Sequence, residues 1–214
     1  GASKIKTIFC NENGDYSFFL SDRYGFNNPD KEWDKKTIDY LLLGNSFVQG
    51  ACVDRPKDIS SQIRKISKKT VLNLGYRNHG PLSQLATLKE YYNPRVKNVI
   101  WFYSEDNDLS ILRNEIKSKI LLNYLNGAFI QNLTNRQKDI DIEIRKSIIK
   151  KIRDGKIKQL LDIVKLKSVR LFLYKFLPDK YQPIKKDLKF NDMFAKILIQ
   201  AKNFSENNNS RFYF

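Results

Sequence analysis

The stretch IDYLLLGNSFVQG, residues 38–50, decides the fold. A short apolar run ends at Gly44, and Ser46 follows directly after the turn. A buried parallel strand delivers side chains to its carboxyl end, where α/β folds place their chemistry. A glycine there permits a sharp turn, and the serine then begins the next helix with its backbone N–H unpaired. We therefore expect a strand over residues 38–43 and a candidate nucleophile at Ser46.

Strand and helix patterns alternate outward from this stretch. Residues 58–69 have helical spacing behind an Asp58 cap, and residues 70–74 form a short strand pattern. A helix over residues 82–92 is entered through Gly80-Pro81, and residues 98–103 are a further apolar strand. This order predicts an α/β fold with a parallel sheet and right-handed crossovers. Residues 1–36 show little periodicity, and 22–30 are typical of a turn-rich loop.

The period changes in the second half of the chain. Residues 110–175 are helical in pattern and too long for a single crossover helix. We expect a helical insertion over 110–189, ending near Pro178, above the carboxyl edge of the sheet. Residues 1–109 and 190–214 would form the α/β core, with a helix over 190–203. A strand starts at 211–214, so we expect the chain to be cut short of a further strand and helix.

Composition limits the class of protein. The 214 residues can bury one good core, and the sequence has no apolar run of the roughly 20 residues that span a bilayer. The net charge is +16. Residues 1–109 hold 16 Lys and Arg against 13 Asp and Glu, whereas residues 110–214 hold 23 against 10. Such a field attracts anionic partners, but solvated lysines of a Lys-, Asn- and Ile-rich chain are the simpler interpretation.

Cysteine and histidine are scarce. Cys10 and Cys52 are too few to predict a disulfide framework, and we expect Cys52 to be a small buried thiol. With His79 as the single histidine, no metal-ligand spacing is present, so neither a metal nor a cofactor is predicted.

Three polar segments each follow a predicted buried strand: residues 44–46 (GNS), 73–82 (NLGYRNHGPL) and 101–109 (WFYSEDNDL). Together they resemble the SGNH (GDSL) hydrolase family, in a bacterial branch, over most of residues 20–110 and more loosely over 190–214. The resemblance implies a flavodoxin-like, three-layer α/β/α fold.

The resemblance also implies roles for particular residues. Ser46 matches the nucleophile and Asn107 the oxyanion-hole asparagine. The glycine whose N–H completes the oxyanion hole maps onto Asn78, with Gly75 or Gly80 as alternative registers. Preorganised donors suit acyl transfer because negative charge develops on the carbonyl oxygen. The chain departs from the family at Asn45, where Asp is usual. The family's base, a His with an Asp three residues earlier, would lie beyond Phe214.

Simpler interpretations stand beside these roles. Ser46 could be a plain helix N-cap, and Asn107 a turn residue that closes a strand. Asp106 and Asp108 are interpreted as capping carboxylates, and His79 as an ordinary loop residue with a small chance of being the base.

The sequence as a whole predicts a serine esterase or O-acyltransferase that needs no cofactor. Its substrate would be a small acyl ester, possibly an acetyl ester on a carbohydrate. The alternative is an inactive SGNH-like scaffold that binds a glycan, lipid surface or nucleic acid through basic helices, with no specific nucleic-acid site predicted. A third possibility, favoured by Asn45 and Asn78, is an esterase relative that serves in assembly. Oligomeric state stays open, as does the compartment, bacterial cytoplasm or cell envelope.

Overall fold

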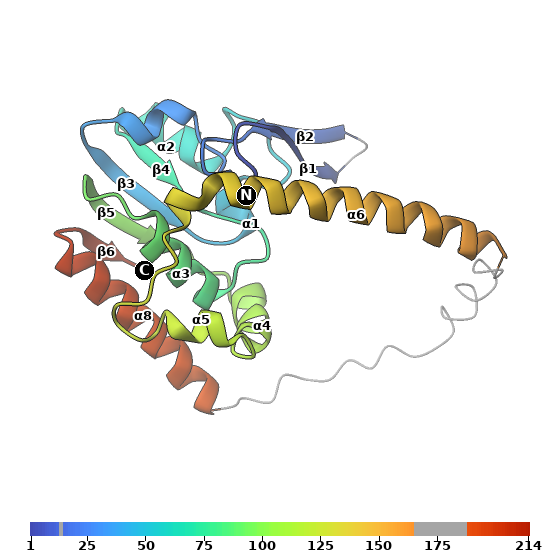
Figure 1. Cartoon of the computed structure of the whole chain (residues 1–214). Helices are drawn as coiled ribbons and strands as arrows, with labels where there is room; N and C mark the ends of the chain where they lie inside the picture. Colours follow the sequence, from blue (N-terminus) through green and yellow to red (C-terminus); the bar gives the residue numbers. More distant parts are fainter. Residues whose placement is uncertain (13–14, 165–187) are drawn as a thin grey trace.

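The computed structural model describes residues 1–12, 15–164 and 188–214 (Figure 1). Its centre is a four-stranded sheet made of β3 (Ile38–Leu43), β4 (Val71–Asn73), β5 (Val96–Trp101) and β6 (Arg211–Tyr213). The strand order is β4-β3-β5-β6, and each neighbouring pair is parallel. This is the strand order of flavodoxin-like folds. With helices on both faces, the predicted three-layer α/β fold is confirmed.

The alternation of side chains along β3 explains the two helical layers. Leu41 and Leu43 belong to the larger core, whereas Leu42 packs with Val48 and Val71 on the opposite face. The larger core is covered by α3 (Pro81–Tyr91) and α8 (Leu188–Asn207). The smaller one is covered by α1 (Ser46–Gln49) and α2 (Ile59–Ser67). Because β3 is buried on both faces, it needs the continuous apolar run that its sequence shows.

Most predicted elements of the sheet are confirmed. The strand over 38–43 matches β3, and the Asp58 carboxylate accepts a hydrogen bond from Ser61 N at 3.0 Å at the start of α2. Helix α3 begins at Pro81, as the Gly80-Pro81 signal indicated. Strand β5 lies slightly N-terminal to the predicted one, and α8 extends beyond the predicted helix at both ends.

The N-terminal region contains a hairpin that the sequence analysis missed. Strands β1 (Lys6–Glu12) and β2 (Asp15–Leu20) pair antiparallel, and a short 3-10 helix, η1 (Asp30–Asp34), follows. The pattern was hidden because apolar side chains lie on the outer face as well: Ile8 is 63% exposed and Leu20 59%. The sequence pair Asn13-Gly14, a common hairpin signal, was the available clue.

The expectation that Cys52 is a small buried thiol is wrong, because Cys10 and Cys52 form a disulfide. The two residues are 42 apart in the sequence, so no local spacing revealed the pair. They meet only because β1 lies beside the segment that follows α1. The disulfide thus ties the hairpin to the chain just after Ser46.

Between β5 and residue 164 the chain is mostly helical. The elements are α4 (Glu105–Glu115), α5 (Lys119–Asn123), the 3-10 turn η2 (Leu133–Arg136) and α6 (Gln137–Val164). Helices α4 and α5 and turn η2 pack against α3, burying Leu112 and Tyr124. Because α4 starts at Glu105, Asn107 lies in a helix rather than in a loop. The predicted end of the insertion near Pro178 lies outside the described residues. None of the described helices combines the length and apolarity of a membrane span.

Candidate active site

The three segments singled out by the sequence meet at the carboxyl edge of the sheet. We call this edge the serine rim and define it as residues 44–50, 75–80 and 102–108. Tyr76 N donates to Gly44 O at 3.1 Å, and Phe102 N donates to Leu43 O at 2.9 Å, so the second and third segments both bond to the first. Glycine permits this close approach, since a Cβ added to Gly75 would lie 2.6 Å from the backbone nitrogen of Gln49.

A buried hydrogen bond joins the immediate neighbours of Ser46 and Asn107. Asn45 Oδ1 caps α1 by accepting from Phe47 N at 3.0 Å, and Asn45 Nδ2 donates to Asp108 Oδ1 at 3.1 Å. The other carboxylate oxygen of Asp108 accepts from Ser104 N at 2.9 Å. Burial raises the pKa of Asp108. The amide of Asn45 can both cap the helix and donate to this carboxylate, whereas an ionised Asp at position 45 could only accept.

Ser46 is the first residue of α1 and is half-buried. Since Asn45 is the N-cap, the interpretation of Ser46 as a plain cap is wrong. Neither the hydroxyl nor the backbone N–H of Ser46 is hydrogen-bonded to another described residue. A partly accessible serine hydroxyl beside an unpaired N–H is the arrangement that a nucleophile needs.

In the second segment, residues 75, 78 and 80 were the possible oxyanion-hole donors, and one of their three backbone N–H groups is unpaired. Gly75 N donates to Asn73 Oδ1 at 2.8 Å, and Gly80 N donates to Glu115 Oε1 at 2.9 Å. Asn78 N has no partner among the described residues. Asn78 is exposed and has a φ of 60°, a left-handed conformation that glycine and asparagine tolerate best. Asparagine can therefore occupy a backbone position that suits glycine.

Asn107 lies in the first turn of α4 and is half-buried. Its backbone is engaged, with N donating to Ser104 O and O accepting from Ser110 Oγ. Its side-chain amide has no hydrogen-bond partner among the described residues. It is therefore available to a bound molecule.

His79 belongs to different surroundings. Its Nδ1 lies 3.3 Å from Thr87 Oγ1, and its ring lies against Tyr76, with centroids 4.8 Å apart. Burial, and secondarily the nearby N-terminal amine, lowers the pKa of His79 to about 4. No hydrogen bond joins it to Ser46, so His79 does not act as a base for Ser46 in this arrangement.

Two functional supports had no signal in the sequence. Glu115, at the end of α4, caps α3 by accepting from Gly80 N at 2.9 Å and Leu82 N at 3.0 Å. Gln84 Nε2 donates to the carbonyl of His79 at 2.9 Å. Glu115 fixes the second segment from a helix distant in sequence, and Gln84 fixes it from the start of α3. Within the described residues, no group of three or more His, Cys, Asp or Glu side chains is arranged to hold a metal ion.

No protein-family model matches the chain, and no curated protein matches its sequence. Among solved structures, the chain is similar to a mutant of the esterase AlinE4. The TM-score is 0.32 at 12% identity, covering 83% of this chain and 76% of the other. A likeness this weak carries no weight for function, which we argue from the site itself.

Proposed function

We propose that the serine rim is the acyl-transfer site of an SGNH-type serine esterase or O-acyltransferase. Ser46 is the nucleophile, and the Ser46 N–H, the Asn78 N–H and the Asn107 amide hold the oxyanion. The observation that carries the proposal is which backbone N–H groups lack a hydrogen-bond acceptor. Gly75 N and Gly80 N are both paired, whereas no described residue accepts from Ser46 N or Asn78 N. Unpaired donors at a site are available to stabilise negative charge.

The chemistry follows from these groups. The Ser46 oxygen attacks the ester carbonyl while a base takes its proton, and the donors bind the negative oxygen of the tetrahedral intermediate. Collapse expels the alcohol, which receives the proton, and leaves an acyl-serine. Water then releases the acid, or a second alcohol takes the acyl group. The base has to come from outside the residues in contact with Ser46, as in the family, where a histidine follows the last strand.

We assign the substrate to small acyl esters, such as acetyl esters on an anionic glycan. Helix α6 supports the choice of anion, because it exposes basic side chains: Arg145, Lys146, Lys150, Lys151 and Arg153. Screening by salt should weaken this attraction. Turnover of an anionic acetylated glycan that does not change with salt would argue against an electrostatic role for α6.

The test is hydrolysis of p-nitrophenyl acetate by the protein in its full natural length. Ser46→Ala should lower kcat/KM by about a thousandfold or more, since the nucleophile is lost. Ser61→Ala, a serine on α2, is the matched control and should leave the rate unchanged. Unchanged turnover in Ser46→Ala would refute the proposal.

The oxyanion hole is tested separately by Asn107→Asp. This variant keeps the shape of the side chain but replaces its amide donor with a negative oxygen, so kcat should fall about 100-fold. Asn114→Asp, at the exposed far end of the same helix, should have little effect. Equal losses in the two variants would indicate a general effect on α4 rather than oxyanion stabilisation.

A non-catalytic scaffold is the second candidate, and one observation favours it. His79 is hydrogen-bonded to Thr87 and not to Ser46. The scaffold predicts no ester turnover at any length of the protein. It also predicts binding of an anionic glycan that survives Ser46→Ala and weakens with salt.

A further inference from the structure

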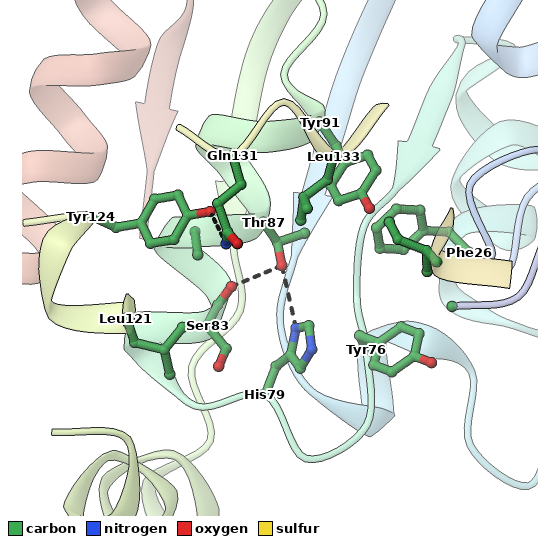
Figure 2. A pocket seen from close by; sticks show the side chains of 13 residues that line it. Phe26, Tyr76, His79, Ser83, Thr87, Tyr91, Leu121, Tyr124, Gln131 and Leu133 are labelled. Atoms are coloured by element: carbon green, nitrogen blue, oxygen red, sulfur yellow. Dashed lines mark hydrogen bonds between the residues drawn. The ribbon is translucent and has the colours of Figure 1, made fainter. Parts of the chain in front are cut away.

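A cavity lies beside α3, and we call it the ring pocket. It has a volume of about 340 Å³ and is bounded by α3, the loop before it, α5 and turn η2. That size is at the lower end of small-molecule sites. Figure 2 shows aromatic side chains around it. These are Phe26, Tyr76, Tyr91 and Tyr124.

The polar side chains of the ring pocket are uncharged: His79, Ser83, Thr87 and Gln131. No described lining residue has a charged side chain. Gly1 also lines the pocket. In a chain of net charge +16, a cavity whose lining side chains are uncharged favours a neutral ligand.

The hydrogen bond from Thr87 to Ser83 favours one tautomer of His79. Thr87 Oγ1 donates its one hydrogen to Ser83 O at 2.8 Å, so toward His79 Nδ1 it can only accept (Figure 2). Nδ1 therefore carries the hydrogen and Nε2 is left with a lone pair. No described residue donates to Nε2. The histidine thus presents a free acceptor within a pocket of aromatic rings.

A second polar group is also unused. The hydroxyl of Tyr91 has no hydrogen-bond partner among the described residues, and in Figure 2 it points toward the space between Thr87 and Phe26. Since Tyr91 lines the pocket, this hydroxyl is available to a ligand there. A ligand with hydroxyl groups would satisfy both Tyr91 and His79.

We propose that the ring pocket binds a small uncharged ring that carries hydroxyl groups. The ring lies against the aromatic side chains, and one hydroxyl donates to His79 Nε2. The site shares Tyr76 and His79 with the 75–80 segment of the serine rim, but Ser46, Asn78 and Asn107 do not line it, so it does not depend on the hydrolase proposal. Planar phenols and saturated glycosides share this chemistry, and the experiment separates them.

The experiment follows the imidazole signals of His79 by NMR during titration with phenol and, separately, methyl β-glucopyranoside. At least one should bind saturably with a Kd of about 1 mM, as expected for so small a ligand. Toluene, which lacks the hydroxyl, and benzoate, which is charged, should each bind about tenfold more weakly than the better ring.

Variants locate the site. His79→Phe keeps an aromatic ring beside Tyr76 but removes the acceptor, so binding should weaken about tenfold, measured by tyrosine fluorescence. Thr87→Val is close in shape but removes the hydroxyl that favours one tautomer of His79. It should therefore weaken binding by a smaller factor. It serves as the second variant if His79→Phe does not fold. Ser46→Ala should leave the Kd unchanged. The proposal is overturned if neither ring binds saturably, if toluene binds as well as phenol and the glycoside, or if the Kd of the better ring is the same in both pocket variants as in the wild type.

Discussion

The serine rim and the ring pocket share one short loop, residues 75–80, yet they differ in how they are built. At the rim, three loops meet because three parallel strands end there, and the free groups are two backbone N–H groups, one hydroxyl and the side-chain amide of Asn107. In the pocket, the walls come from segments that meet only through helix packing, and the free groups are side-chain atoms. Motifs on consecutive strands can be found in a sequence, whereas a wall assembled from distant helices leaves no motif.

The supports of the two sites differ in the same way. The rim is held by the Cys10–Cys52 disulfide and by the Asn45–Asp108 hydrogen bond. The pocket is held by charged side chains of α3. Lys89 Nζ donates to Tyr124 O at 2.6 Å, and the Glu90 carboxylate accepts from Tyr124 Oη at 2.6 Å and from Leu133 N at 2.8 Å. Removing each support separately shows whether the two sites are independent.

The largest effect is expected from the disulfide. Replacing Cys10 and Cys52 by serine frees a loop closed over 42 residues. The free energy of unfolding should fall by about 4 kcal/mol on the chain-entropy estimate. Urea denaturation with and without reductant measures it, since only the wild type should respond to reductant. An equal urea midpoint for the two proteins without reductant would contradict the pairing.

Asn45→Asp is the next largest. It places a second carboxylate against Asp108, in a buried site. The free energy of unfolding should fall by about 3 kcal/mol at pH 7. One carboxyl of the pair then has a raised pKa, so the loss should shrink as pH falls and the pair shares a proton. A loss that is the same at pH 4 and pH 7 would contradict this account. The isosteric Asn114→Asp is the exposed control.

Glu90→Gln tests the pocket wall. The amide retains one acceptor oxygen, but its NH₂ faces donors, so unfolding should become easier by about 2 kcal/mol. Binding of the better ring should weaken in parallel, while Ser46 chemistry should not change. Glu206→Gln is the control, because Glu206 forms an exposed ion pair with Lys202 that contributes little. Loss of esterase activity together with ring binding would mean that the sites are coupled.

The smallest effect is the loss of stability at acidic pH that comes from His79. Its folded pKa of about 4 is lowered from 6.5, so the unfolded chain binds more protons between these values and stability is lost as pH falls below 6.5. At pH 5.5 the wild type should have lost about 1.5 kcal/mol of this contribution. The difference in unfolding free energy between wild type and His79→Phe should therefore change between pH 7.5 and 5.5. A constant difference would contradict a buried neutral imidazole.

Sequence reasoning reached the parts of the molecule that have local rules. The apolar run before Gly44, the Asp58 cap and the Gly80-Pro81 entry each predicted an element that is present. It missed the β1–β2 hairpin because that hairpin exposes Ile8 and Leu20 and so lacks the usual alternation. Long-range pairs were out of reach. Cys10 with Cys52, and Glu115 with Gly80, are brought together only by the tertiary fold.

The candidate site was chosen from the sequence, and its roles stay predictions. Ser46, Asn78 and Asn107 were singled out from their places after strand ends together with the resemblance to the SGNH family. The pairing of Gly75 N and Gly80 N, which distinguishes Asn78 from its neighbours, depends on Asn73 and Glu115 and was not predictable. The same holds for the surroundings of His79, which involve Thr87 in the second turn of α3.

The most direct test of the acyl-transfer proposal is covalent. The full-length protein is treated with diisopropyl fluorophosphate, and its peptides are mapped by mass spectrometry. We predict one phosphorylated peptide, carrying the adduct on Ser46, that is absent in Ser46→Ala and forms more slowly in Asn107→Asp. An unmodified Ser46 under conditions that label a reference serine esterase, or an adduct on another residue with Ser46 intact, would contradict the proposal.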